Sequence, residues 1–193
     1  TEKLTDYVNP FVGTDGYGNV YPGAQIPFGG IQMSPDTDSR FYDAASGYKY
    51  NHLTLMGFSL THLSGTGIPD LGDFLFIPGT GEMKLEPGTH EDPDKGYRSR
   101  YSHDKEWASP NYYAVELADY GVKAEMTSGV RSGMFRFTYP ESDSAFIMID
   151  MNHTLWQSCE WSNLRMINDS TITGYKLVKG WGPDSHVYLT ATF

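Results

Sequence analysis

Apolar and polar residues alternate with a period of two through most of the second half of the chain. In the segment Asn111–Ala118, apolar side chains take every second position, which is typical of a strand with one buried face. The same alternation predicts further strands at Val122–Thr127, Met134–Tyr139, Ile172–Lys179 and Ser185–Phe193. The continuous apolar run Ala145–Asp150 lies between polar turns, and it predicts a central strand of a sheet.

These strands recur every 8–12 residues or so with short turns between them, which is the spacing of an antiparallel sandwich. The first hundred residues are less regular, with strands expected around Gly29–Met33 and Asp73–Ile77 and a polar loop at Pro78–Arg100. We find no long amphipathic helix, no linker and no internal repeat. We therefore expect an all-β antiparallel sandwich that forms a single domain over residues 1–193. Because Phe193 falls in an apolar alternating strand, we also expect the chain to be a fragment of a longer protein.

The composition narrows the classes of partner. The 193 residues carry a net charge of -10 and give a pI of about 4.9, which argues against nucleic acid and against an anionic membrane surface. No apolar run approaches the roughly 18 residues that span a bilayer, so we expect a soluble chain. Aromatic residues make up 15% of the sequence, and together with Asp and Asn they suit a neutral ligand such as a sugar. Cys159 has no second cysteine for a disulfide and is interpreted as a small buried hydrophobe.

The loop His62–Asp73 carries the densest group of polar side chains. It follows an apolar run that ends near Leu60, and it combines imidazole, hydroxyl and carboxylate groups with glycines. Loops on a rigid scaffold commonly bind ligands, although these residue types also favour ordinary turns. We expect His62 either to donate a hydrogen bond to a ligand hydroxyl or to hold the loop, and Asp73 to bond backbone donors. The spacing of the acidic residues and the histidine does not fit a zinc site.

A second loop, Asn9–Gly23, contains four glycines together with Asp15 and Asn19. Glycines allow tight turns and a close approach of the backbone to a ligand. The loop lacks the lysine and the following helix of a phosphate loop, and it lacks the alternating acidic residues of a calcium hand. From these residues alone, a structural turn is the favoured interpretation.

The remaining polar clusters do not define a catalytic centre. The segments His103–Trp107 and Trp156–Trp161 combine polar and aromatic residues, and we interpret both as packing in the core or in loops. Hydrolysis of a glycoside needs two carboxyl groups placed across the scissile bond. Carboxylates are present at Asp15, Asp70, Asp73, Glu106 and Glu160, but their spacing marks no pair. We assign no catalytic residue and no metal ligand to this chain.

Three segments together resemble the N-terminal region of family 92 glycoside hydrolases. They are Asp6–Thr37, Ser46–Asp73 with its THLSGTG motif, and Tyr97–Leu117 with the following Gly121–Pro140. The closing segment Lys179–Phe193 is similar to a late strand of the same region. The resemblance covers nearly the whole chain in order. The family consists of calcium-dependent, inverting, exo-acting α-mannosidases.

The resemblance implies a galactose-mutarotase-like supersandwich domain that packs on a helical (α/α)6 domain, with the active site between them. It implies an α-1,2-mannosidase-like enzyme that removes terminal mannose from glycans such as N-glycans. The catalytic carboxylates and most ligands of the calcium cofactor would lie in the later domain, so we expect this chain alone to be inactive. A stand-alone carbohydrate-binding module is the alternative.

The resemblance also implies partners and binding residues. The partners are a mannose-containing glycan and the enzyme's own C-terminal domain, in a secreted or periplasmic bacterial enzyme or a surface lipoprotein. By matching motif, the implied substrate-binding residues are Asp15, Gly16, Asn19, Tyr42, His62, Ser64, Gly65, Thr66, Gly67 and Asp70.

Three positions depart from the family pattern. Members often carry a tryptophan and a cysteine before the SGY segment, where this chain has Tyr42 and Ala45, and a cysteine after GTG, where it has Ile68. We expect these positions to line the leaving-group side of the site. The preference among α-1,2, α-1,3 and α-1,4 linkages therefore stays open, and so does a mannose-phosphate substrate.

Overall fold

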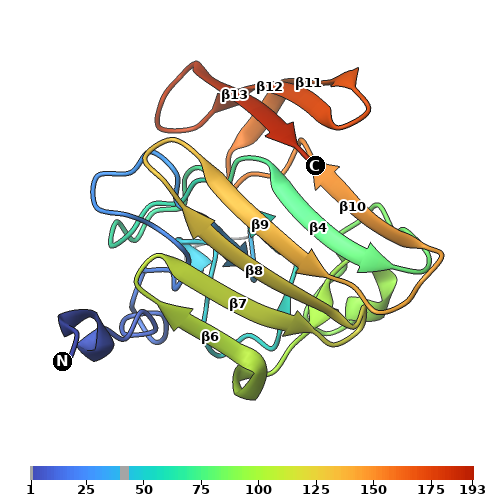
Figure 1. The fold of residues 1–193 in the computed structure, drawn as a ribbon. Coiled ribbons are helices and arrows are strands. Elements are labelled where there is room, and N and C mark those ends of the chain that lie inside the picture. The colour runs from blue at the N-terminus through green and yellow to red at the C-terminus, as the bar shows by residue number, and fades with distance from the viewer. Residues whose placement is uncertain (1, 40–43) are drawn as a thin grey trace.

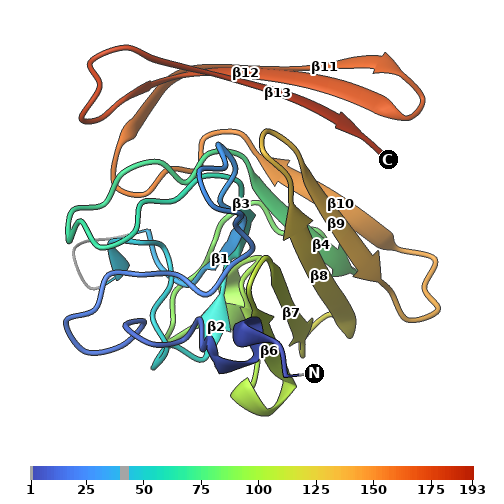
Figure 2. The same cartoon turned by 60° about the vertical axis from the view of Figure 1, so that its left-hand side comes forward.

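The fold consists of antiparallel β-sheets in layers, as the period-two pattern predicts. The structure is a computed structural model that describes residues 2–39 and 44–193. Two four-stranded sheets pack face to face, and a three-stranded sheet lies across one end of this sandwich (Figures 1 and 2). The described residues form no α-helix, and their 3-10 turns are short and include Leu4–Tyr7, Pro93–Lys95 and His103–Lys105. The expectation of an all-β sandwich is confirmed.

The strands pair as four separate sheets. The first sheet has the order β1 (Ser34–Asp36), β3 (Gly57–Ser59), β4 (Leu75–Thr80), β10 (Ala145–Asp150). The second has the order β6 (Glu106–Ser109), β7 (Tyr112–Leu117), β8 (Val122–Ser128), β9 (Gly133–Thr138). The third has the order β11 (Ser158–Asn168), β12 (Thr171–Lys179), β13 (Ser185–Thr192). A short ladder joins β2 (Thr54–Leu55) to β5 (Ser99–Arg100).

Aromatic side chains join the two large sheets. Phe58 on β3 is fully buried, and its ring centroid lies 6.3 Å from those of both Phe135 and Phe137 on β9. Phe76 on β4 lies 5.1 Å from Phe135. The rest of the core includes Met33, Tyr48, Tyr113, Val115, Leu117, Val122, Ala124 and Met126. Burial of each large apolar side chain stabilises the fold by about 1.5–3 kcal/mol, so this core gives the loops a rigid support.

The third sheet presents one face of its central strand to the sandwich. Along β12, buried and half-buried residues alternate, and the buried set is Ile172, Gly174, Lys176 and Val178. A lysine at the centre of such a face is unusual, because burial of an ammonium group is costly unless an anion pairs with it. Lys176 therefore points to a charged partner between the third sheet and the sandwich.

Most of the strands predicted from alternation are present. The predictions at Asn111–Ala118, Val122–Thr127, Met134–Tyr139, Ile172–Lys179 and Ser185–Phe193 correspond to β7, β8, β9, β12 and β13. The prediction at Asp73–Ile77 corresponds to β4, which begins two residues later and extends to Thr80.

Three local predictions are wrong. Gly29–Met33 is not a strand, because Gly29 closes a turn onto Ile26, and the strand β1 begins only at Ser34. The run Ala145–Asp150 is an edge strand that pairs with β4 alone, and its residues are half-buried or exposed. An apolar run does not specify the position of a strand in a sheet. The segment Trp156–Trp161 is not packed in the core, because both tryptophans are more than half exposed: Trp156 lies in the loop before β11, and Trp161 lies on β11, which begins at Ser158.

The core position predicts a clear difference between two leucine truncations. Leu117 on β7 is 2% exposed, whereas Leu85 in the long polar loop is 75% exposed. We expect Leu117→Ala to lower the free energy of unfolding by about 2–5 kcal/mol, because it removes buried methyl groups and leaves a cavity. Leu85→Ala, the matched control, should change it by about 0.5 kcal/mol or less. Urea unfolding measures both, and equal losses would contradict this core.

Candidate functional site

The structure brings the two glycine-rich loops into contact. The Gly65 amide donates a hydrogen bond to the Asn19 carbonyl, with 2.5 Å between the two atoms. The Asn19 side chain also lies against Gly67, since a Cβ atom added there would be 3.3 Å from Asn19 Nδ2. Two segments about 45 residues apart in the sequence thus form one surface, as the resemblance implies.

A buried lysine holds the first loop, Asn9–Gly23. Lys49 is largely buried, and its Nζ atom donates to the Gly16 carbonyl at 2.5 Å. The Tyr50 amide donates to the Thr14 carbonyl at 2.9 Å. Asp15 remains exposed and accepts the Gly16 amide at 2.7 Å, so its carboxylate caps a tight turn at the surface.

The base of the second loop is closed by a short ladder. The Leu60 amide donates to the Asp73 carbonyl, and the Gly72 amide donates to the Thr61 carbonyl. The Thr61 hydroxyl donates to Asp73 Oδ2 at 2.8 Å and accepts the Asp73 amide at 3.0 Å. We expected the Asp73 side chain to accept hydrogen bonds from backbone amides. This expectation is wrong, because its Oδ2 atom accepts from the Thr61 hydroxyl instead.

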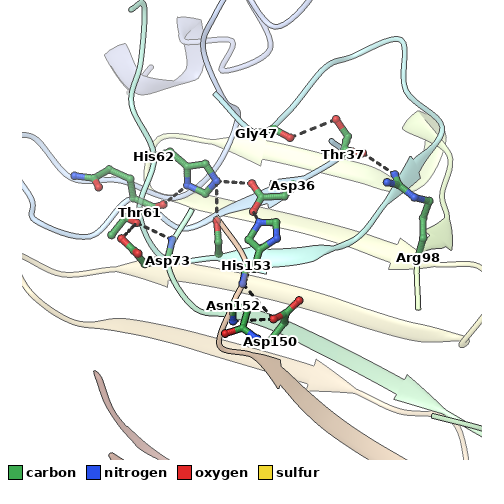
Figure 3. Close-up of polar contacts among 12 residues, drawn as sticks. Asp36, Thr37, Gly47, Thr61, His62, Asp73, Arg98, Asp150, Asn152 and His153 are labelled. Carbon is green, nitrogen blue, oxygen red and sulfur yellow. Dashed lines mark hydrogen bonds and ion pairs between the residues drawn. The ribbon is translucent and has the colours of Figure 1, made fainter. Parts of the chain in front are cut away.

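Below this loop, Asp36 binds two histidines in the interior of the molecule. Its Oδ1 atom lies 2.7 Å from His62 Nε2, and its Oδ2 atom lies 2.7 Å from His153 Nε2 (Figure 3). The exposed fractions of Asp36, His62 and His153 are 0%, 3% and 7%. Asp36 ends β1, His62 begins the loop and His153 follows β10, so one carboxylate joins three distant segments.

The hydrogen-bond partners define the charge of this cluster. Burial would raise the pKa of Asp36, but the charge and hydrogen bonds of His62 and His153 together hold it well below its ordinary value of 3.8. The carboxylate is therefore ionised, and both histidine Nε2 atoms must donate to it. His62 Nδ1 lies 2.6 Å from the Gln32 carbonyl, which can only accept. His62 consequently carries a proton on each nitrogen and forms a buried ion pair with Asp36.

A second buried ion pair continues the cluster to the third sheet. Lys176 Nζ lies 3.2 Å from Asp73 Oδ1 and donates to the His153 carbonyl at 2.6 Å. Lys176 is fully buried and Asp73 is 3% exposed. The two cations, His62 and Lys176, balance the two anions, Asp36 and Asp73. We refer to these four residues and His153 as the buried charge cluster.

The other predicted binding residues lie in different parts of the structure. Ser64, Gly65 and Thr66 are exposed, Gly67 is half-buried, and all four lie beside Asn19 or next to the residues that contact it. Asp70 is 9% exposed and lies near Gly180, on the side of the third sheet. Tyr42 lies outside the described residues.

Of the two roles expected for His62, bonding a ligand hydroxyl or holding the loop, the structure supports the second. Both of its ring nitrogens are within hydrogen-bond distance of protein oxygens, and the ring is buried beneath the loop. A ligand hydroxyl therefore finds no ring nitrogen to accept from in this arrangement. His62 holds the loop that presents Ser64–Gly67.

Sequence reasoning missed a cleft next to Asp70. Asp150, Asn152, Trp156 and Gln157 help to line a cleft of about 310 Å³ in the connection between β10 and β11. Trp156 is 56% exposed and has a positive φ of 74°, which is strained for a tryptophan. The Gly180 position touches both Gln157 and Asp70. The sequence pattern does not distinguish Trp156 from a packed tryptophan; its exposure and its place beside this cleft do.

Asp36 and His153 were also missed. Asp36 lies in an SPDTD run that reads as a turn, and His153 lies in a short polar connection. Neither residue has a spacing motif, because the partners of the carboxylate come from positions 26 and 117 residues away. Among residues 2–39 and 44–193, no three His, Cys, Asp or Glu side chains group in a way that could hold a metal ion.

The sequence of the chain matches the model of a known protein family. Residues 7–193 match the glycosyl hydrolase family 92 N-terminal domain. The chain belongs to this family, and the resemblance drawn from the loop motifs is confirmed.

Solved structures agree with the assignment. A family GH92 alpha-mannosidase from Bacteroides thetaiotaomicron is 97% identical over 100% of this chain, with a TM-score of 0.98. A second structure of that enzyme is in complex with mannoimidazole. The GH92 family glycosyl hydrolase ccman5 is 28% identical over 97% of the chain, with a TM-score of 0.77. The chain covers 26% of the first of these proteins and 26% of ccman5.

A curated relative matches a smaller part of the chain. An uncharacterized secreted glycosidase of Arthroderma benhamiae is 29% identical over 140 residues, which make up 72% of this chain and 18% of the relative. The chain thus spans about a quarter or less of the length of the relatives it matches.

Two glycines test the packing around the buried charge cluster. Gly47 and Gly65 have φ values of +83° and +79°, but only at Gly47 would a Cβ atom overlap the Asp36 carboxylate. We expect Gly65→Ala to cost about 1–2 kcal/mol of stability, from backbone strain alone. Gly47→Ala should cost about 2–5 kcal/mol, because it also displaces a buried hydrogen-bonded carboxylate. Chemical denaturation compares the two, and equal costs would contradict the placement of Asp36.

The pKa of Asp36 predicts the direction of acid destabilisation. Its pKa is lower in the folded than in the unfolded chain, so its contribution to stability is complete above the unfolded value of 3.8. The contribution is lost as the pH falls from about 4 towards the lower folded pKa. We expect Asp36→Asn, which cannot ionise, to show a weaker fall of the thermal midpoint on acidification. Identical acid profiles for the wild type and this variant would contradict an ionised Asp36.

Proposed function

We propose that the longer protein carrying this chain is an exo-acting α-mannosidase, α-1,2-mannosidase-like, that removes terminal mannose from glycans. The observation that supports this most directly is the 97% identity over the whole chain to a family GH92 alpha-mannosidase. The complex of that relative with mannoimidazole supports a mannose-type ligand. The family resemblance assigns the departures at positions 42, 45 and 68 to the leaving-group side, so the linkage preference is the least constrained part of this proposal.

In this proposal the chain supplies walls of the mannose pocket. The exposed residues Ser64–Thr66 present hydroxyl and amide groups that can bond sugar hydroxyls, and Asn19 and Asp15 extend the same surface. Because the buried charge cluster and Lys49 hold both loops from beneath, these groups are presented in a fixed arrangement. Preorganised polar groups lose little conformational entropy when a ligand binds.

The acid and base of the reaction belong to another part of the longer protein. In the described residues, Glu106 accepts hydrogen bonds from Tyr48 and Tyr113, and Asp73 bonds Thr61. Such carboxylates are occupied by structural partners, whereas an inverting glycosidase needs an acid and a base with a water between them. The family resemblance implies a calcium cofactor, and we assign most of its ligands to the same other part; the described residues contain no group of three or more His, Cys, Asp or Glu side chains that could hold a metal ion.

The partner that completes the pocket is the protein's own C-terminal domain. Within the first loop, Val12 is 73% exposed and Tyr17 is fully exposed, which leaves apolar side chains available to a covering domain. The described residues include no helix long and apolar enough to cross a membrane. A secreted or periplasmic location, or attachment to the surface as a lipoprotein, is consistent with the relative that is described as secreted.

A stand-alone carbohydrate-binding module is the second candidate function. Trp156, Trp161 and Trp181 are each more than half exposed, and exposed tryptophan faces stack on sugar rings. A module would bind mannosides without any other domain, whereas half of a pocket would not. The exposed tryptophans therefore make this alternative testable on the isolated chain.

We expect the longer protein to hydrolyse aryl α-mannosides and mannobiose with inversion, and residues 1–193 alone to show no turnover. The reason is that the chain offers binding groups without an acid and base pair. Product anomers are followed by NMR, and binding of mannobiose to the isolated chain is measured by calorimetry. Inactivity of the longer protein on all α-mannosides would contradict the proposed function, and micromolar binding to the isolated chain would favour the module.

A further inference from the structure

The loop that presents Ser64–Gly67 has few contacts of its own. Within the loop, the Thr66 hydroxyl donates to the Ile68 carbonyl at 3.0 Å, and the Gly65 amide reaches across to Asn19. The side chains at its tip are exposed. Its position therefore depends on how its two ends are held.

Each end of the loop is tied to a buried ion pair. At the first end, His62 bonds Asp36 (Figure 3), and at the second end, Asp73 pairs with Lys176. His62 and Leu71 also form an isolated bridge, so the two ends lie side by side. A shift of either ion pair is consequently transmitted to the same short loop.

His153 links the two ion pairs to each other. Its ring donates to Asp36 Oδ2, and its carbonyl accepts from Lys176 Nζ. Its amide donates to Asp150 Oδ1 at 3.1 Å, which places it at the end of β10. The cluster therefore connects the edge of the sandwich, the third sheet and both ends of the loop.

The buried ion pairs fix the orientation of their side chains, which apolar packing would not do to the same degree. Paired charges in a protein interior are often no more stabilising than well-packed apolar residues, although removal of one partner is strongly destabilising. What such pairs provide is a defined geometry, since the hydrogen bonds of Asp36 fix the orientation of both imidazole rings. Two of the charged groups, His62 and Asp73, belong to the ends of the loop. The other two, Asp36 and Lys176, pair with them.

We propose that Asp36, His153 and Lys176 are positioning residues for the mannose-binding loop, acting through His62 and Asp73. The proposal rests on the proposed function, because it assigns these residues to the binding step of the same site. Their role is to hold the loop and not to bond the sugar. They hold Ser64–Gly67 against Asn19 so that the sugar-binding groups keep their spacing.

The test uses the longer protein and compares Asp36→Ala with Leu117→Ala. Both changes destabilise the sandwich, but Leu117 lies on β7 in the second sheet and is part of neither loop nor of the buried charge cluster. Because the loop contributes to binding of substrate and transition state alike, we expect Asp36→Ala to raise KM about tenfold or more with kcat changed about twofold or less. Leu117→Ala should lower the thermal midpoint and leave KM at the wild-type value.

Two further variants separate charge from shape. In Asp36→Asn, the amide oxygen can accept from one imidazole and the amide group can donate to a neutral His62, so KM should lie between the wild type and Asp36→Ala. His153→Gln keeps one donor near Asp36 and should raise KM less than Asp36→Ala does. If Asp36→Ala does not fold, KM and hydrogen exchange are measured on these two variants and on Lys176→Met instead.

Hydrogen exchange of peptides within 62–73 gives a readout that needs no substrate. We expect faster exchange in Asp36→Ala and wild-type exchange in Leu117→Ala. An unchanged KM in Asp36→Ala, or equal exchange in both variants, would overturn the positioning role. If the wild-type protein hydrolyses no α-mannoside while the exchange of the loop still differs between the variants, the proposed function fails and the positioning of the loop stands.

Discussion

The ionised carboxylate of Asp36 is the contact on which the arrangement of the site depends. It is fully buried, and it can remain charged there only because two imidazole groups donate to it from opposite sides. Asp36 itself ends β1, and its partners come from the loop after β3 and from the connection after β10, so a single side chain joins three segments of the fold. Loss of one partner would leave a buried charge without compensation, which is far more costly than loss of a surface ion pair.

The sandwich and the third sheet are joined by the same chemistry. The aromatic core of Phe58, Phe76 and Phe135 packs the two large sheets by burial of apolar area, which has little directional preference. Lys176 instead meets the loop through a charged group whose partners must be placed within hydrogen-bond distance. The fold thus uses apolar packing for stability and buried charges for the orientation of its loops.

Part of the candidate site could be predicted from the sequence. The polar and glycine-rich character of Asn9–Gly23 and His62–Asp73 identified both loops, and the structure places Asn19 against Gly65. The role of His62 could not be read in the same way, because a histidine in a loop has the same sequence context whether it faces a ligand or a buried aspartate. Burial and the acceptors on both ring nitrogens distinguish the two.

The sequence by itself determined the β class and most strand positions, because a side-chain period of two is a local property of an extended backbone. It also determined the family, since the loop motifs are contiguous in the chain. Only the tertiary structure decided that Ala145–Asp150 is an edge strand and that Asp36 pairs with His62 and His153. Strand order and the partners of a buried charge depend on residues far apart in the chain. No local pattern records them.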